Sequence, residues 1–278
     1  MLKKNKILKK ICLKLSEEEF QKSKIIEVFE NIIFVKKRKF WEIEIFTSEV
    51  VKDYNQIKNL FKIDVKKIKN VKKKNWLLQN HNNDCGIETN LFFFSQGLKK
   101  KNQKKNQIII HNSRAFGTGR HESTYLAIKN IESITKKRKF KSCCDVGSGS
   151  GILSFVLRKI TMKKVIATDI DFQSEKVFFE NRNYNHINGI NFYRCDGLNS
   201  YQLKKIKFDL IVSNTFSNIL KKHSLQFRKK LKLGGVLIIS GILISQKNEL
   251  VAHFSKINLK LIKNICLKDW VSLIFIRK

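Results

Sequence analysis

Hydrophobic residues in the second half of the chain fall into short apolar segments separated by longer amphipathic stretches. Helix-length stretches separate five of these segments, which we expect to be strands: residues 142–146, 164–169, 190–194, 209–213 and 235–240. Strands that alternate with helices favour a parallel sheet covered by helices, the α/β class. Two further apolar segments, residues 259–265 and 271–276, lie only a few residues apart. Their spacing predicts an antiparallel hairpin at the end of the sheet.

The first part of the chain has shorter and more mixed elements. Apolar residues alternate at Ile11, Leu13 and Leu15, as in a strand, and Ser16 begins a pattern typical of a capped helix start. The other elements expected there are two strands and a helix, at residues 31–35, 40–46 and 50–61. We expect a small α+β domain, a basic linker and the α/β domain, over residues 1–97, 98–112 and 113–278.

One turn of the α/β region carries candidate chemistry. Residues 145–151 read Asp-Val-Gly-Ser-Gly-Ser-Gly, between an apolar strand and an amphipathic helix. Alternating glycines let the backbone close tightly around a ligand, because a Cβ atom would block both the turn and the approach. The next apolar segment ends at Asp169, where a carboxylate is placed to accept hydrogen bonds from a ribose diol. The pattern predicts a nucleoside-type cofactor site that includes Asp145, Gly147, Gly149 and Asp169.

Two other interpretations of this turn stay open. A dinucleotide fold has the spacing G-x-G-x-x-G and directs a helix N-terminus at a pyrophosphate, whereas this turn reads D-x-G-x-G-x-G. A leading acid favours a ligand that carries an amino group and a sulfonium over one that carries phosphates. The second interpretation is an ordinary glycine-rich turn that binds no ligand.

The turn resembles motif I of the class I S-adenosylmethionine (SAM) methyltransferases, and Asp169 resembles their ribose-binding acid. Residues 114–124 read Arg-Ala-Phe-Gly-Thr-Gly-Arg-His-Glu-Ser-Thr, which resembles the A-F-G-T-G-x-H-x-[ST]-T signature of the ribosomal protein methyltransferase family PrmA. The resemblance extends from about residue 75 to the C-terminus, whereas the N-terminal region matches weakly. Glu122 stands where the family usually has proline. Further similar pieces are Asp169-Ile170-Asp171, Asn181, Val212-Ser213-Asn214, Ser240-Gly241-Ile242-Leu243, Gln246 and Trp270.

The resemblance implies a Rossmann-like class I methyltransferase domain with a mostly parallel seven-stranded sheet. It also implies an enzyme that uses SAM to methylate lysine side-chain or N-terminal amino groups of protein eleven of the large ribosomal subunit, with the N-terminal region gripping that protein. The family's SAM contacts fall on Thr124, Gly147, Asp169 and Asn214. The residues themselves support the last three of these, since Asn214 ends a predicted strand at the rim where open α/β sheets bind ligands. Thr124 rests on the resemblance alone.

The roles of several residues follow from this implied chemistry. We expect Asn214 to orient the amine or the amino end of SAM as the catalytic residue, and we identify no general base and no metal ligand. Asp145 binds the SAM amino group through water or merely holds the turn. His121 is a base or, more simply, orders its loop through a hydrogen bond. Asp196 meets the adenine edge or belongs to a plain turn, and Cys143 and Cys144 are expected in the core.

The net charge of +34, from 57 basic and 23 acidic residues, has two explanations. A basic surface condenses on nucleic acid, so ribosomal RNA stays open as a partner. Composition offers the alternative: only nine of the basic residues are arginine, and proline is absent where average usage would give about fourteen. Both biases are typical of an A+T-rich coding sequence. The charge by itself therefore does not identify a substrate.

Other function classes remain beside the protein N-methyltransferase. The same domain could methylate RNA gripped by a basic N-terminal domain, or the chain could be a non-catalytic ribosome-associated relic of the fold. No apolar run approaches the ~18 residues that a membrane span needs, and no signal-peptide core follows the basic N-terminus. We therefore expect a cytoplasmic protein that does not bind membranes, with reduced cysteines, and we take a monomer as the default.

Overall fold

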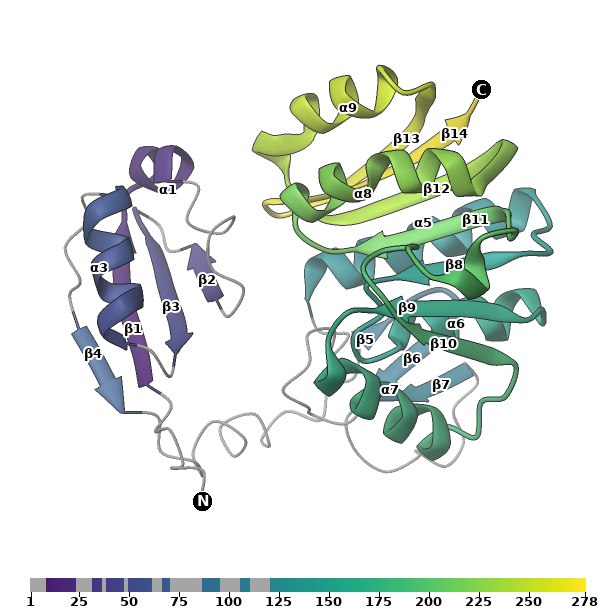
Figure 1. Cartoon of the computed structure of the whole chain (residues 1–278), viewed down its shortest axis with the longest axis horizontal. Coiled ribbons are helices and arrows are strands. Elements are labelled where there is room, and N and C mark those ends of the chain that lie inside the picture. Colours follow the sequence, from purple (N-terminus) through teal and green to yellow (C-terminus); the bar gives the residue numbers. More distant parts are fainter. Residues whose placement is uncertain are drawn as a thin grey trace. The chain divides into compact units, whose positions relative to one another are not determined.

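The computed structural model describes residues 9–23, 32–36, 39–47, 50–61, 67–70, 87–95, 106–110 and 121–278. The chain divides into two compact units, Met1–Asn82 and Asn83–Lys278 (Figure 1). No helix within the described ranges is both long and apolar enough to cross a bilayer.

The first unit holds an antiparallel sheet of four strands in the order β2-β3-β1-β4. Alternate residues of β1 face partners on β3, as in the pairs of Ile11 with Ile45 and Leu13 with Ile43, and all four side chains are buried. Ser16 and Glu19 form the reciprocal capping bonds expected at the start of α1, at 2.7 and 3.3 Å. The elements are β1 (Lys9–Leu15), α1 (Glu17–Ser23), β2 (Ile32–Lys36), β3 (Trp41–Thr47), α3 (Val50–Phe61) and β4 (Lys67–Asn70).

The second unit is built on a seven-stranded sheet with the order β10-β9-β8-β11-β12-β14-β13. Its first five strands are parallel, and β14 pairs antiparallel with both β12 and β13. All seven predicted strands and the C-terminal hairpin are confirmed. The strands are β8 (Cys143–Val146), β9 (Val165–Asp169), β10 (Ile190–Arg194), β11 (Phe208–Asn214), β12 (Leu231–Leu243), β13 (Leu259–Leu267) and β14 (Trp270–Arg277).

Helices cover both faces of this sheet (Figure 1). Successive strand residues point to opposite faces, so Val212 belongs to the core that contains residues of α5, α6 and α7, and Ile211 to the core that contains residues of α8 and α9. The two cores make the sheet buried on both sides, as a parallel α/β sheet requires. The helices are α5 (Glu122–Lys137), α6 (Ile152–Thr161), α7 (Phe172–Tyr184), α8 (Ser217–Lys230) and α9 (Lys247–Ser255).

A small three-stranded sheet of β5 (Ile87–Glu88), β6 (Phe92–Ser95) and β7 (Asn106–Ile109) belongs to the second unit. Phe92 and Ile108 are fully buried in the same core as α5, and Glu132 of α5 accepts hydrogen bonds from Thr89 Oγ1 at 2.5 Å and the Leu91 amide at 3.0 Å. The division between the units therefore does not coincide with the expected boundary after residue 97. The segment expected as a linker includes β7, and its remaining part, apart from Ile110, lies outside the described residues.

Candidate active site

The glycine turn joins β8 to α6 and closes back onto β9. The amides of Gly147 and Ser148 both donate to the Thr168 carbonyl, at 2.8 and 3.0 Å. Gly147, Gly149 and Gly151 have φ angles of 72°, 51° and 88°, in the left-handed region that favours glycine. The turn therefore depends on all three glycines for its conformation.

Two of these glycines have different surroundings. A Cβ atom added at Gly151 would lie 2.6 Å from the Phe155 ring and 2.8 Å from the Phe178 ring, so this position is needed for packing. A Cβ atom at Gly147 would meet no atom of the described residues within 4 Å. The backbone at Gly147 thus faces open space, which is what the close approach of a ligand requires.

Asp169 lies at the end of β9, beside the glycine turn. Its Oδ2 accepts from the Gly149 amide at 2.8 Å, and its Oδ1 from the Asp171 amide at 3.0 Å. Burial raises the pKa of this carboxyl group, while the two amides oppose that effect. Each carboxylate oxygen can accept a further bond, so Asp169 is held in one orientation with acceptor capacity left for a diol.

Asp145, at the end of β8, is almost completely buried. Ser154 donates to its Oδ2 at 2.6 Å, but its Oδ1 is buried and has no hydrogen-bond partner among the described residues. Burial raises the pKa of Asp145 to about 7. A buried acceptor without a partner costs about 1–3 kcal/mol, so a site that keeps one points to a ligand that supplies the missing donor.

The partnerless atoms gather at one edge of the sheet. Across the described segments, six buried side-chain polar atoms have no hydrogen-bond partner, and four of them lie on the ends of β8, β9 and β11 or in the glycine turn. These strands are neighbours in the sheet, and their carboxyl ends meet at the edge where open α/β sheets bind ligands. The four atoms are Asp145 Oδ1, Ser148 Oγ, Thr168 Oγ1 and Asn214 Oδ1.

Thr124 and Asn214 meet across ninety positions of sequence. Asn214 ends β11, and its Nδ2 donates to Oγ1 of Thr124, in the first turn of α5, at 3.1 Å. Ser240 of β12 holds the same turn by donating to the Ser123 carbonyl at 2.8 Å. Because Nδ2 is engaged with Thr124, the amide oxygen of Asn214 is left as the acceptor on the site side of the pair.

His121 caps helix α5. Its Nδ1 accepts from the Ser123 amide at 3.2 Å and lies 2.8 Å from Ser123 Oγ, and its ring packs edge-on against Trp270 with 4.4 Å between centroids. Burial lowers the pKa of His121, which favours the neutral ring that can accept these bonds. Glu122 pairs with Lys268 of the β13–β14 turn. These contacts support an ordering role for His121 at the start of α5, whereas residues 111–120, including the A-F-G-T-G segment, lie outside the described residues.

The remaining candidates from the sequence, Asp196, Cys143 and Cys144, have other surroundings. The Asp196 carboxylate binds His223 at 2.8 Å and Lys222 at 2.7 Å, and the bond from Lys222 lowers the pKa of Asp196. These contacts support the plain-turn interpretation. Cys143 and Cys144 are buried in β8, as expected, and burial raises the pKa of Cys143 to about 12.

Sequence reasoning missed part of the site. Thr168 and Ser148 contribute partnerless hydroxyls, and Asn181, indicated only by resemblance, donates from Nδ2 to the Ser150 carbonyl at 3.0 Å. Nothing in the residues themselves signalled these roles, because each depends on packing between distant segments.

The chemistry of the site favours a ligand rich in hydrogen-bond donors. Its polar groups are two carboxyls, two hydroxyls and the oxygen of one amide, and a pyrophosphate would face both carboxyls. The dinucleotide interpretation is disfavoured on these grounds. In the described part of the chain, no three His, Cys, Asp or Glu residues are grouped so as to hold a metal ion.

Comparison with known proteins assigns the family. Residues 3–278 match the family described as "Ribosomal protein L11 methyltransferase (PrmA)". The chain is 37% identical over 168 residues to the ribosomal protein L11 methyltransferase of Agrobacterium fabrum, covering 60% of this chain and 58% of that protein. It is 36% identical over 178 residues to that of Prochlorococcus marinus strain MIT 9312, covering 62% and 57%. The matches thus span less than two thirds of these relatives' own length.

A solved structure agrees with this assignment. The crystal structure of the ribosomal protein L11 methylase of Lactobacillus delbrueckii subsp. bulgaricus is 28% identical and superposes with a TM-score of 0.62, covering 68% of this chain and 96% of that chain. The family match covers residues 3–278, which is much more of the chain than the glycine turn alone. The chain belongs to the ribosomal protein L11 methyltransferase (PrmA) family.

Proposed function

We propose that the chain is a SAM-dependent N-methyltransferase that methylates lysine side-chain or N-terminal amino groups of the ribosomal protein for which its relatives are named. The observation that carries the cofactor assignment is the group of four partnerless buried atoms beside the glycine turn. The family assignment supports the protein substrate. We further propose that the N-terminal α+β region contacts that substrate and that the protein is a cytoplasmic monomer.

The site residues fit SAM by their chemistry. Asp169 would accept from the ribose diol, and Gly147 would let the backbone approach the ligand. Asp145 Oδ1 and Asn214 Oδ1 are acceptors for the ammonium group of SAM, and Thr124 holds the Asn214 amide in the orientation that presents its oxygen to the site. When bound, SAM would supply a methyl group activated by a sulfonium.

The amine that receives the methyl group must be neutral. Deprotonating a lysine of pKa about 10.4 at pH 7 costs about 4.6 kcal/mol, whereas an α-amino group of pKa about 8 costs about 1.4 kcal/mol. Desolvation lowers an amine's pKa, so closure of the site around the substrate supplies part of this cost without a dedicated base. The Asn214 oxygen would accept one N–H of the amine and thereby turn its lone pair toward the methyl group. Such alignment is worth several kcal/mol.

The first test is direct binding of SAM and transfer of label. Asp169→Ala should weaken SAM binding about 10- to 100-fold in calorimetry, because it removes charge-assisted bonds worth about 1.5–3 kcal/mol. Asp209 offers a matched control: it also accepts from two backbone amides, Lys141 and Ser142, at 2.9 Å each, but at the opposite end of the sheet. Asp209→Ala should leave SAM affinity within about twofold, and equal losses in both variants would contradict the site.

The substrate is tested with methyl-labelled SAM and a mixture of ribosomal components, followed by protease or nuclease digestion. Protease-sensitive label on one small ribosomal protein, lost in Asp169→Ala, is the expected result. Nuclease-sensitive label would replace the proposal with the RNA methyltransferase. Absence of both label and SAM binding would leave the non-catalytic relic.

A further inference from the structure

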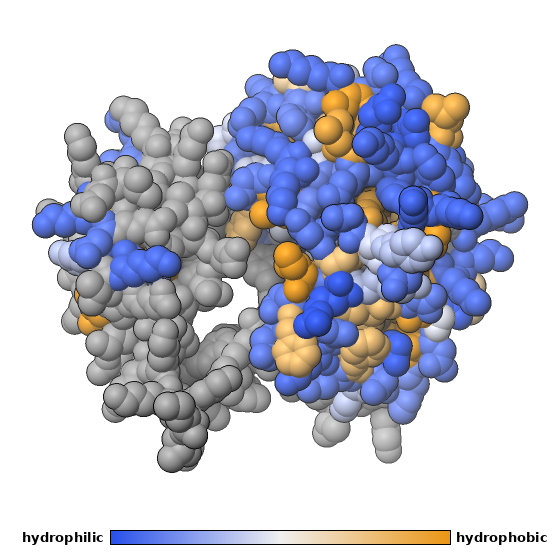
Figure 2. All heavy atoms as spheres, viewed as in Figure 1, coloured by the Kyte–Doolittle hydropathy of each residue, from blue (hydrophilic) through white to orange (hydrophobic). Residues whose placement is uncertain are grey.

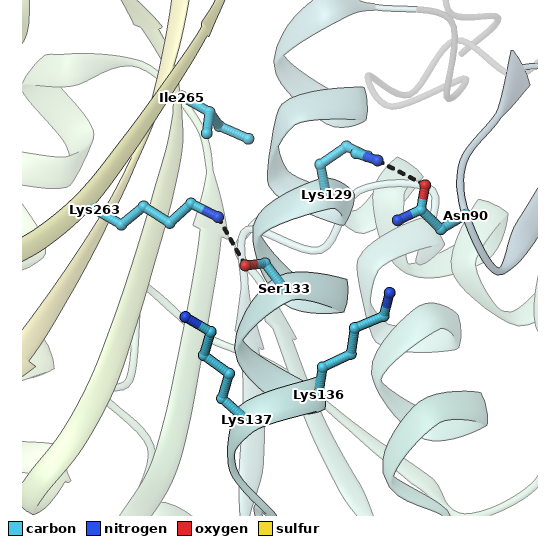
Figure 3. Close-up of a pocket in the computed structure, with 7 residues that line it drawn as sticks. All are labelled: Asn90, Lys129, Ser133, Lys136, Lys137, Lys263 and Ile265. Atoms are coloured by element: carbon cyan, nitrogen blue, oxygen red, sulfur yellow. Dashed lines mark hydrogen bonds between the residues drawn. The ribbon is translucent and has the colours of Figure 1, made fainter.

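The exposed face of the second half of α5 carries a concentration of lysines. Together with Lys263 of β13, three of its lysines line a hollow of about 320 Å³ (Figure 3). We call this group the lysine hollow, defined by Lys129, Lys136, Lys137 and Lys263. Figure 3 shows Lys263 and Lys137 on the β13 side of the helix, and Lys129 and Lys136 on the side of Asn90.

No carboxylate among the described residues neutralises the positive charge of the hollow, since none of them pairs with any of the four ammonium groups. Lys129 Nζ donates to Asn90 Oδ1 at 2.8 Å, and Lys263 Nζ to Ser133 Oγ at 2.7 Å, so neutral acceptors position these two groups and leave their charge intact. The acids of α5 are engaged elsewhere, since Glu122 binds Lys268 and the buried Glu132 binds the β5–β6 turn.

The extent of the lysine hollow along α5 indicates a polymeric ligand. Lys129 and Lys137 are eight residues apart, about 12 Å along the helix axis. One strand of a B-form duplex carries a phosphate per about 3.4 Å of axis, so a span of about 12 Å corresponds to about three or four phosphate intervals, that is, about four to five successive phosphates.

The lining residues also indicate how such a ligand would be read. Those that the structure describes include no arginine and no aromatic side chain, which are the groups that read bases through forked hydrogen bonds or stacking. Lysines act as point charges that contact phosphates without regard to sequence. We propose that the lysine hollow binds the phosphate backbone of an RNA strand. The choice of RNA over another polyanion rests on the proposed function, because a ribosomal protein substrate occurs together with RNA.

The hollow is separate from the cofactor site. Thr124 lies in the first turn of α5, whereas the lysines lie 5 to 13 residues further on, about 8–20 Å along the axis. RNA bound there would hold the protein beside RNA-associated substrates without occupying the site of methyl transfer. The two sites can therefore be tested independently.

The test measures binding of the full chain to a fluorescein-labelled single-stranded RNA of about twenty nucleotides, by anisotropy over a series of KCl concentrations. The test variant replaces all four lysines of the hollow with glutamine. The control variant, Lys163→Gln/Lys164→Gln/Lys204→Gln/Lys205→Gln, changes four exposed lysines elsewhere on the same unit and so removes the same charge. Melting curves establish that both variants fold, and Lys136→Gln/Lys137→Gln, which breaks no described hydrogen bond, is measured beside them.

We expect the test variant to lose at least about tenfold in affinity, with the slope of log K against log[KCl] reduced by about 3, near 0.7 for each lost contact. The control should lose less than about threefold, and the double variant an intermediate amount. Equal losses in test and control variants would overturn the proposal, as would displacement of the RNA by tripolyphosphate at equal phosphate concentration. SAM binding, measured in parallel, should be the same in all variants. If the wild type binds no SAM but the difference in RNA affinity persists, the proposed function fails and the hollow stands.

Discussion

Asp145 should make the stability of the protein fall as the pH rises. Its pKa is about 7 in the folded protein against 3.8 as the ordinary value, so between these values the folded state holds a proton that the unfolded state has released. Stability then decreases with pH, because the folded state binds more protons than the unfolded state. The loss begins above pH 3.8 and is complete just above pH 7.

The size of the effect follows from the two pKa values. A carboxyl group with these values costs about 1.7 kcal/mol of stability at pH 5 and about 4.3 kcal/mol at pH 8, relative to a group that is neutral throughout. Asp145→Asn is neutral at every pH, so the stability of this variant minus that of the wild type should rise by about 2.6 kcal/mol between pH 5 and pH 8. Asp169, whose pKa is also raised by burial, is present in both proteins, and its charge is one of the causes that raise the pKa of Asp145.

The assay is urea unfolding at several pH values, followed through Trp270 in a background that carries Trp41→Phe and Trp76→Phe. Ser154→Ala serves as the control, since it removes the hydroxyl that donates to Asp145 Oδ2 and should raise the pKa of Asp145 further. A difference between Asp145→Asn and wild type that stays constant within about 0.5 kcal/mol from pH 5 to pH 8 would refute the reasoning. Saturating SAM should stabilise the wild type more than Asp145→Asn at pH 8, because an ammonium group favours the charged carboxylate.

Three further predictions concern the neighbouring residues. Gly151→Ala should lower the free energy of unfolding by more than about 2 kcal/mol, measured by urea unfolding, because the new methyl group would overlap Phe155 and Phe178. Gly147→Ala should lower it by only about 1 kcal/mol but abolish SAM binding. Equal losses of stability in the two variants would contradict this distinction. Thr124→Val should reduce kcat/KM about tenfold while leaving the unfolding midpoint nearly unchanged, since it frees the Asn214 amide to rotate, and full activity would exclude a positioning role. His121→Ala should cost about 1 kcal/mol at pH 8 through loss of the helix cap, and less at pH 5. Because the pKa of His121 is lowered in the folded protein, the stabilisation by its neutral ring is lost as the pH falls below the ordinary value of 6.5, and a cost that does not change with pH would contradict this assignment.

The fold could be predicted well wherever the signal is local. Apolar segments bounded by glycine and polar residues gave the strands of the sheet, and the positive φ angles at Gly147, Gly149 and Gly151 are what the alternating glycines indicated. The β5-β6-β7 sheet was not predicted, because its attachment to the second unit is long-range. Nothing near Thr89 in sequence signals that its hydroxyl meets Glu132, 43 residues away.

The same limit explains the two halves of the candidate site. Asp169 and Gly147 could be proposed from the residues alone because each lies within one strand–turn unit. The proposed role of Thr124 depends on its contact with Asn214, which the fold brings beside it from 90 positions away. The net charge shows this contrast most clearly. The number of lysines does not say where they lie in space, so the sequence could not separate a compositional bias from a binding surface. Figure 2 shows hydrophilic residues over most of the visible face of the second unit. The fold places Lys263, from the edge strand β13, beside three lysines of α5, and none of the four pairs with a carboxylate of the described residues. If these lysines reflect bias alone, the hollow and the four control lysines should contribute equally to RNA binding, so the comparison of the two variants separates the two explanations.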